Sequence, residues 1–166
     1  MKWYEKLKPS NDVVISSRVR LARNLEDYPF PTKLDPETSK KAAFAVRQAF
    51  DADFPEKLEF SEMNLNAQKS CLLEEHIISP DFCAESDLYR ALMTDSDGTL
   101  AVMINEEDHV RIQAIFPGLS LDEAYSRADS ADDALNKGAK IAFDEKLGFL
   151  TSCPTNLGTG MRASVM

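Results

Sequence analysis

Basic residues are the scarce class in this sequence. Its 166 residues include 19 lysines and arginines against 28 aspartates and glutamates, so the formal net charge is -9 at pH 7. A chain of this balance repels nucleic acid unless its basic residues cluster. One cluster is present, because Arg18, Arg20 and Arg23 lie in a single short segment. The cluster indicates a small anionic ligand, and the alternative is a set of ordinary surface ion pairs.

Cysteine is scarce as well. The three cysteines, Cys71, Cys83 and Cys153, are odd in number and form no C-x-x-C pair. This pattern argues against a disulfide framework and against a cysteine-based zinc site. It predicts a protein of the reducing cytoplasm.

Long apolar runs and phosphate-binding glycine motifs are absent. The run at residues 100–104 is far shorter than the ~20 residues of a membrane-spanning helix, and residues 1–15 lack the apolar core of a secretory signal. No G-x-x-x-x-G-K-[ST] occurs, and no G-x-G-x-x-G follows a strand, which excludes a Walker P-loop, a Rossmann fingerprint and a protein-kinase glycine loop. The sequence also has no repeats and no linker, so residues 1–166 are expected to form one globular domain.

Hydrophobic patterning predicts an α+β protein with a mostly antiparallel sheet flanked by helices. A meander, with a turn at Asp95–Gly98, supplies the predicted central pair of strands, 99–105 and 109–116, and helices are expected on one face. The other predicted strands are 13–21, 58–63, 89–94, 149–152 and 162–166. Helices are predicted at 36–54, at 65–75, and after each of two S-x-x-[DE] caps at Ser120 and Ser130, the last ending near residue 146. The apolar strand at the end of the sequence leads us to expect a truncated chain.

Three segments contain residues that could carry chemistry, and the first is residues 16–20. Alternate residues of a strand share a face, so Arg18 and Arg20 are expected to point the same way, about 7 Å apart. Two guanidinium groups at that spacing can hold neighbouring oxygens of a polyphosphate. The alternative is a solvated basic strand face.

The second segment is the acidic turn at residues 105–111. Glu106, Glu107 and Asp108 are three consecutive carboxylates, and crowded carboxylates differ in pKa, so one of them can serve as a general base. The alternative is a solvated turn. We assign His109 a structural hydrogen-bonding role, and Arg111 on the following strand could join the phosphate-binding group.

The third segment is the glycine-rich loop at residues 153–162. Cys153 precedes this loop, whose backbone N–H groups could stabilise a thiolate. The alternative is a buried apolar cysteine, which is the commonest state of this residue.

Together, and in this order, the three segments resemble the signature blocks of the phosphagen (guanidino) kinases: SSRVR at 16–20, NEEDH at 105–109 and CPTNLGTGMRASV at 153–165. The resemblance covers residues 12–166. It is strongest to the bacterial protein-arginine kinases of the family, because only residues 1–15 precede the first block and residues 160–166 match the bacterial form.

The resemblance implies an α+β, glutamine-synthetase-like catalytic domain that transfers the γ-phosphoryl group of ATP, with Mg²⁺, to the guanidinium of arginine residues in proteins. It assigns Glu107 as the catalytic base and Cys153 as the thiolate beside the guanidinium, and no residue as a direct metal ligand. The nucleotide-binding residues that it implies are Ser16, Ser17, Arg18, Val19, Arg20, His76, Arg111, Arg162, Ala163, Ser164, Val165 and Met166.

The resemblance also sets expectations beyond this sequence. Further phosphate-binding arginines and a second substrate-binding glutamate would follow Met166, so residues 1–166 are expected to be the N-terminal half of the catalytic domain, without the helical domain that metabolite kinases carry before it. The implied partners are arginine-containing proteins such as a heat-shock repressor, a zinc-finger activator, a Clp protease and a second copy of the chain, with no nucleic acid and no membrane. The alternatives are a kinase for a free guanidino metabolite and a non-catalytic nucleotide-binding fragment.

Overall fold

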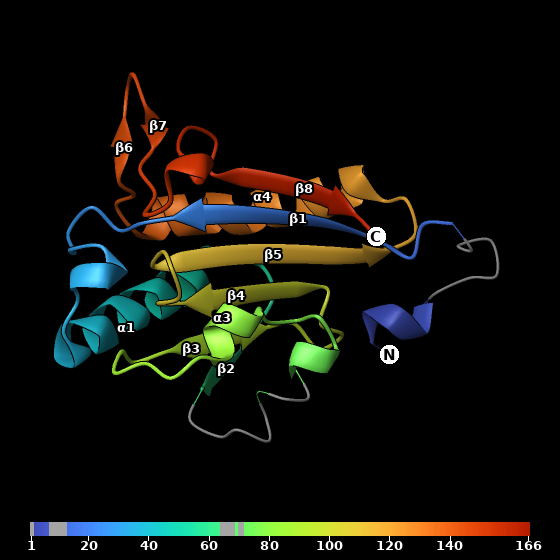
Figure 1. Ribbon diagram of the computed structural model, residues 1–166, viewed down its shortest axis with the longest axis horizontal. Coiled ribbons are helices and arrows are strands. Elements are labelled where there is room, and N and C mark those ends of the chain that lie inside the picture. The colour runs from blue at the N-terminus through green and yellow to red at the C-terminus, as the bar shows by residue number, and fades with distance from the viewer. Residues whose placement is uncertain (1, 7–12, 64–68, 70–71) are drawn as a thin grey trace.

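The protein is an α+β structure built on a six-stranded sheet (Figure 1). The computed structural model describes residues 2–6, 13–63, 69 and 72–166. Its elements in chain order are η1 Trp3–Lys6, β1 Ser16–Arg23, η2 Pro31–Lys33, α1 Pro36–Asp53, β2 Glu59–Glu62, α3 Pro80–Cys83, β3 Ala91–Thr94, β4 Leu100–Ile104, β5 Val110–Pro117, α4 Leu121–Gly138, β6 Phe143–Asp144, β7 Gly148–Phe149, η3 Pro154–Asn156 and β8 Met161–Val165.

The strands of the large sheet pair in the order β2-β3-β4-β5-β1-β8, and every pairing is antiparallel. The predicted meander is confirmed, with β4 and β5 as the central pair and Gly98 at φ 72 in the turn that precedes β4. A positive φ costs glycine nothing, which is why this position suits it. The first strand of the chain therefore lies between β5 and the last strand.

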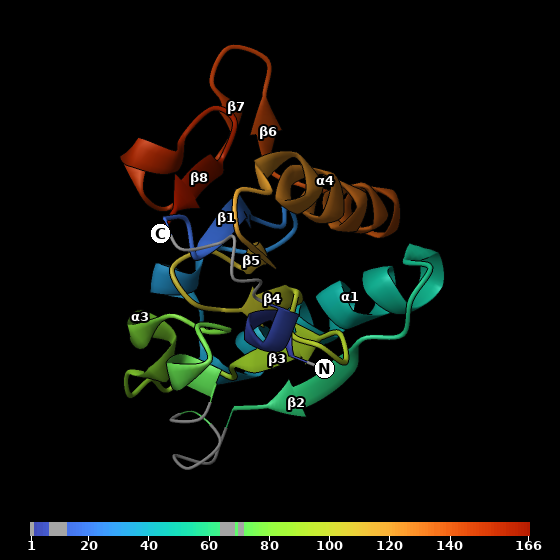
Figure 2. The same cartoon turned by 90° about the vertical axis from the view of Figure 1, so that its right-hand side faces the viewer.

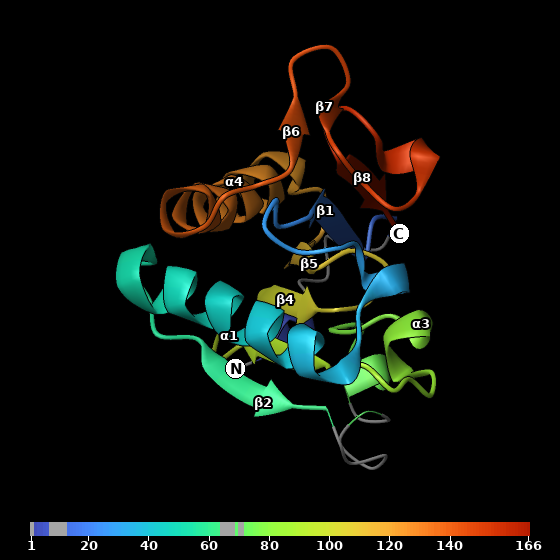
Figure 3. The same ribbon diagram turned by 90° about the vertical axis from the view of Figure 1, so that its left-hand side faces the viewer.

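The two long helices, α1 and α4, cover one face of the sheet (Figures 2 and 3). Helix α1 begins where predicted, because the Asp35 carboxylate accepts hydrogen bonds from the backbone N–H groups of Glu37 and Thr38. Small residues line the buried side of both helices and allow close approach. Gly138 marks the closest point, since a Cβ there would lie 2.5 Å from the Cα of Ala49.

The opposite face of the sheet is only partly covered. Met103, Ala101 and Leu92 of this face pack against Ile77 and Phe82, which belong to the segment around α3. Figure 2 shows α3 on the side of the sheet away from α1 and α4. The sequence predicted helices on one face only. The structure has an additional short helical segment on the opposite face, and the rest of this opposite face stays open.

The C-terminal third differs from the prediction in its helices and in one strand. Ser130 does not begin a second helix, because residues 121–138 form one continuous helix in which Ser130 is exposed. The helix ends at Gly138, and the β6–β7 hairpin replaces its predicted extension to residue 146. The strand predicted at 149–152 is reduced to the end of β7. Most of the helix predicted at 65–75 lies outside the described residues.

No helix in the described part of the chain is long and apolar enough to cross a membrane.

The single helix α4 predicts opposite effects for two cap substitutions. Ser130→Ala should leave the free energy of unfolding unchanged or raise it by up to ~0.5 kcal/mol, because alanine is the better residue inside a helix. Asp35→Ala should lower it by about 1 kcal/mol, because Asp35 is a true N-cap. Chemical denaturation measures both. A loss of about 1 kcal/mol in Ser130→Ala would restore the two-helix interpretation.

Candidate active site

Four arginines from three strands share the open face of the sheet. Arg18 and Arg20 lie two residues apart on β1, so their side chains leave the same face. In the register of the sheet, Arg162 of β8 is directly opposite Arg20, and Arg111 of β5 is opposite Ala22. Directly paired residues point to the same side, so pairing brings together the four arginines that the sequence predicted as one group.

The positive charges of this group are poorly compensated. Burial, followed by the charges of Arg162 and Arg111, lowers the pKa of Arg18. Burial and the neighbouring arginines lower the pKa of Arg20 to about 10. In the described part of the chain, ion pairs with carboxylates are formed by Arg111 and not by Arg18, Arg20 or Arg162. A multiply charged anion would relieve this repulsion, so the arrangement favours binding of phosphates.

The acidic turn at residues 105–109 separates its three carboxylates by burial. Glu106 is 2% exposed at its side chain, and its carboxylate meets Arg111 Nη1 at 2.7 Å and accepts a hydrogen bond from the Ser79 hydroxyl. Burial raises the pKa of Glu106, although Arg111 and Ser79 oppose the shift. Glu107 is 43% exposed at its side chain and lies 3.6 Å from Arg111 Nη2. Glu107 is therefore the carboxylate of this turn that a substrate can reach.

Asp108 and His109 have structural roles. The Asp108 carboxylate accepts hydrogen bonds from Asn24 Nδ2 at 2.6 Å and from the backbone N–H of Ser152 at 2.7 Å. His109 Nδ1 accepts the backbone N–H of Leu25 at 3.1 Å. Burial lowers the pKa of His109 to about 4, so the imidazole is neutral at pH 7. This agrees with the structural role assigned from the sequence.

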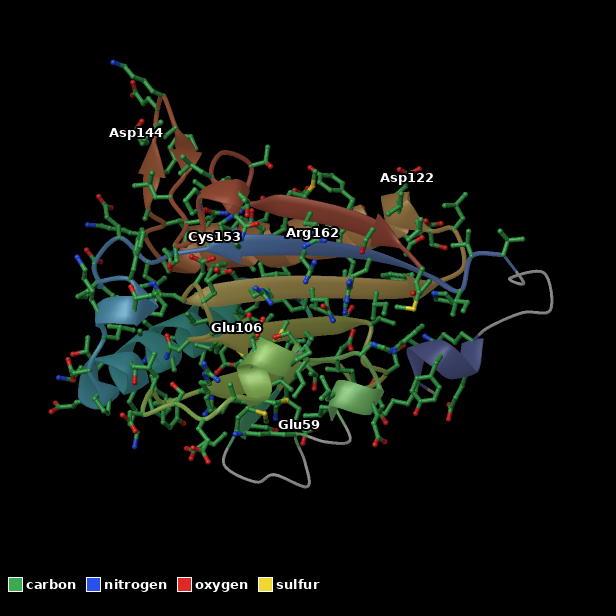
Figure 4. All side chains as sticks on the ribbon, in the orientation of Figure 1. Glu59, Glu106, Asp122, Asp144, Cys153 and Arg162 are labelled. Atoms are coloured by element: carbon green, nitrogen blue, oxygen red, sulfur yellow. The ribbon has the colours of Figure 1, made fainter. Side chains whose placement is uncertain are left out.

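Cys153 lies in the same cavity as Glu107. The cavity has a volume of about 320 Å³, and its lining includes Arg20, Arg111 and Arg162 besides these two residues. The Cys153 thiol is 2.9 Å from the Thr155 hydroxyl and is partly exposed. In Figure 4 the labels of Cys153 and Arg162 lie beside β1, and that of Glu106 lies near β4. The pattern of a thiol and a carboxylate beside three guanidinium groups matches the predicted set.

A second cavity of about 390 Å³ adjoins the first. His76 and Arg18 line it, and Arg20, Ser79 and Pro80 line both cavities. His76 is thus brought next to the arginines from a segment far away in the sequence. Arginines line both cavities. Glu107 and Cys153 line the first cavity, and His76 lines the second.

The remaining residues of the predicted set lie on two different faces of the sheet, because side chains alternate between the faces along a strand. Ser16 and Ser164 lie on the arginine side, whereas Val19 and Ser17 point to the helix side, as do their partners Ala163 and Val165. Ser17 is fully buried and bonds the turn at Gly118 and Ser120, so the side chains of Ser17 and Val19 cannot enter the cavities. The expectation that Ser17 and Val19 accompany the arginines at a ligand stays a prediction, and it cannot concern their side chains. Met166 contacts β1 through its backbone N–H, donated to Ser16 O.

Arg23 also leaves the cluster in which the sequence placed it. Arg23 is a buried residue, only 3% exposed. Its guanidinium binds both oxygens of Asp132 at 2.9 and 2.7 Å and lies 3.5 Å from the centre of the Phe149 ring. It ties α4 to the loop before β8. Sequence reasoning missed two residues that line the cavities, Ser79 and Gln113. Only the alternation of β5, which puts Gln113 on the face of Arg111, could have indicated one of them.

Arg20→Met tests the uncompensated charge. At neutral pH the arginine is protonated in both the folded and the unfolded state, so its lowered pKa, about 10, means that its charge destabilises the folded state. Removing the charge and keeping the aliphatic stem should raise the free energy of unfolding by up to about 1 kcal/mol, a value discounted for screening by solvent. Thermal unfolding should also show that pyrophosphate stabilises the wild type more than the variant. A destabilised variant with undiminished pyrophosphate stabilisation would contradict this account.

Comparison with known proteins agrees with this geometry. The family model described as ATP:guanido phosphotransferase, C-terminal catalytic domain, matches residues 38–166. A protein-arginine kinase of Syntrophomonas wolfei is 50% identical over 161 residues, covering 94% of this chain and 45% of the relative. A protein-arginine kinase of Geobacillus stearothermophilus is 44% identical, covering 99% of this chain and 46% of the relative. The chain thus spans about half the length of the curated relatives it matches.

Solved structures share the fold. The substrate-free duplicated taurocyamine kinase of Schistosoma mansoni superposes with a TM-score of 0.82 at 27% identity, covering 98% of this chain and 25% of that one. A lombricine kinase superposes with a TM-score of 0.77 at 22% identity, covering 98% of this chain and 50% of that one.

Proposed function

Because the chain belongs to the ATP:guanido phosphotransferase family, we propose that it is part of a protein-arginine kinase, which moves the γ-phosphoryl group of ATP to an arginine side chain. The observation that carries the proposal is that Glu107 and Cys153 line the same cavity as Arg20, Arg111 and Arg162. Phosphoryl transfer depends mainly on positioning and charge neutralisation, and this cavity supplies groups for both.

The arginines are proposed to hold the triphosphate of ATP. Arg20, Arg111 and Arg162 would bind the phosphates, and Arg18 and His76 would extend the site toward the nucleoside. Mg²⁺ supplies further neutralisation of phosphate charge. No group of three or more His, Cys, Asp or Glu side chains among the described residues is arranged to hold a metal ion. We propose that Mg²⁺ enters the site with ATP, held mainly by phosphate oxygens and water, as is usual for this ion.

Glu107 and Cys153 are proposed to handle the substrate guanidinium. A guanidinium is a poor nucleophile because its pKa is above 12 and it stays protonated. Glu107 would accept a proton from the attacking nitrogen, which then forms the N–P bond as the bond from the γ-phosphorus to the β–γ bridging oxygen breaks and ADP leaves. A Cys153 thiolate would hold the guanidinium in line by charge. The acidic wall of the cavity thus faces the cationic substrate, and its basic floor faces the phosphates.

The domain assignment follows from the sheet. We propose that residues 1–166 belong to one catalytic domain, because β1 lies between β5 and β8 although it precedes the segment that the family model matches. The finer expectations from the resemblance stay proposals: a cytoplasmic stress-response enzyme with a heat-shock repressor as substrate, a zinc-finger activator, a Clp protease as partner and a self-associating chain.

Glu107→Gln tests the base in the natural full-length protein. The amide keeps the shape of the side chain but accepts no proton, so kcat should fall at least ~100-fold while the Kd for ATP stays within about twofold. Phosphoarginine formation and nucleotide titration measure the two quantities. Glu59→Gln on the edge strand β2 is the matched control and should be fully active (Figure 4). A Glu107→Gln enzyme with more than a tenth of wild-type turnover would remove Glu107 from the mechanism.

A direct assay separates the protein substrate from a free guanidino metabolite. The protein-arginine kinase relatives at 44–50% identity favour arginine within proteins, whereas the taurocyamine and lombricine kinases are similar at 22–27%. We expect MgATP to label an arginine-rich protein with acid-labile phosphate and to leave free arginine unlabelled. Efficient labelling of free arginine with none on protein would reverse the choice. Binding of ATP with labelling of neither would favour the non-catalytic fragment.

A further inference from the structure

The backbone turn that carries His76 is held by two side chains from distant parts of the chain. Three successive carbonyl oxygens, those of Glu75, His76 and Ile77, accept hydrogen bonds from Trp3 and Gln113. His76 itself has a φ of 57, in the left-handed region that residues other than glycine rarely adopt. Such a conformation persists where the surroundings over-determine it. The two donors provide part of that constraint, beside the burial of Ile77, which is 1% exposed.

Trp3 holds the outer side of this turn. Its indole Nε1–H donates to Glu75 O at 2.9 Å, and its ring is buried, with the residue only 4% exposed. The backbone N–H of Trp3 donates to Asp97 O at 3.0 Å, which anchors η1 on the turn between β3 and β4. Gly98 of this turn packs closely against Ile77, since a Cβ on Gly98 would lie 3.0 Å from the Ile77 side chain, and the Trp3 ring is in ordinary contact at 3.9 Å. The N-terminal segment is therefore fastened to the turn and to the sheet together.

Gln113 holds the same turn from the floor of the site. Its Nε2 donates to His76 O at 2.8 Å and to Ile77 O at 3.2 Å, and the residue is 4% exposed. On β5 it lies two residues after Arg111 and directly opposite Arg20. The turn is thus attached to the strand face that carries the arginines, and it forms one wall of the 390 Å³ cavity.

We propose that Trp3 and Gln113 are positioning residues that clamp this turn and set the affinity for the nucleoside part of a nucleoside triphosphate. The proposal rests on the proposed function, since it needs a nucleotide whose phosphates lie on the arginines. It follows because different parts of the fold carry the residues of the two cavities. Arg20, Arg111 and Arg162 are carried by paired strands, whereas His76 is carried by a turn whose position depends on the clamp.

The test compares two ligands, MgATP and inorganic tripolyphosphate with Mg²⁺, by calorimetric titration of the natural full-length protein. Trp3→Phe keeps an aromatic ring and removes the N–H donor, and Gln113→Met keeps the size and removes the amide. Trp3→Phe should weaken ATP binding about fivefold, the effect of one neutral hydrogen bond, and Gln113→Met, which removes two, at least as much. Both should leave the Kd for tripolyphosphate within about twofold. Trp3 gives the cleaner result because it does not line the cavity, whereas Gln113 does.

Gln48→Met is the matched control for the glutamine, because Gln48 is exposed on α1, on the other face of the sheet. It should change neither affinity. Unchanged ATP affinity in Trp3→Phe and Gln113→Met would overturn the clamp, and so would equal weakening of both ligands, which indicates general damage to the site. A wild type that binds neither ligand would overturn the proposed function itself, together with the clamp. Thermal unfolding of each variant identifies any failure to fold, and the other variant then decides.

Discussion

The antiparallel register of β1 against β5 and β8 is the constraint on which the candidate site depends. A slip of one residue in a strand exchanges its two faces. Here such a slip would turn Arg18 and Arg20 into the core under the helices and expose Val19 and Leu21, which are 1% and 3% exposed. The apolar side of β1 therefore holds the register. Because β8 and β5 are paired to it, the same apolar contacts align Arg162 and Arg111 with the arginines of β1.

The aligned cluster conflicts with the stability of the unliganded fold. Four guanidinium groups share one face, and the lowered pKa values of Arg18 and Arg20 reflect both burial and mutual repulsion. Glu106 offsets part of this charge, since it is buried against Arg111 and bonded to Ser79. The second conflict is the left-handed His76, which is held by hydrogen bonds from elsewhere. Departures from local preference are expected at functional sites, and the residues that show these two departures line the two adjoining cavities.

Much of the sheet could be predicted from sequence, because alternation and turn chemistry are local signals. The turn at Gly98 and the strands on either side of it are examples. The failure at Ser130 has a physical reason. A cap motif inside a helix has the same letters as one at its start, and only the continuing buried stripe of Ala128, Ala131 and Leu135 distinguishes them.

The close contact between Gly148 and Gly158 could not be predicted. Gly148 begins β7 at φ 79, and a Cβ on it would lie 2.5 Å from the carbonyl oxygen of Gly158. Such a contact cannot be read from either segment alone.

The arginines and the acidic turn could be found in the sequence, but the division of labour among the carboxylates could not. From local physics Glu106, Glu107 and Asp108 are equivalent, and their different burial comes from partners far away in the chain: Ser79 for Glu106, and Asn24 and Ser152 for Asp108. Asp108 also joins two parts of the site. It bonds Asn24, which directly follows β1, and the backbone of Ser152, which precedes Cys153. The position of the thiol relative to Glu107 is thus set by a neighbouring carboxylate that no substrate reaches. Within three residues, the turn thus holds one exposed carboxylate, that of Glu107, and two that are buried by partners from distant parts of the chain.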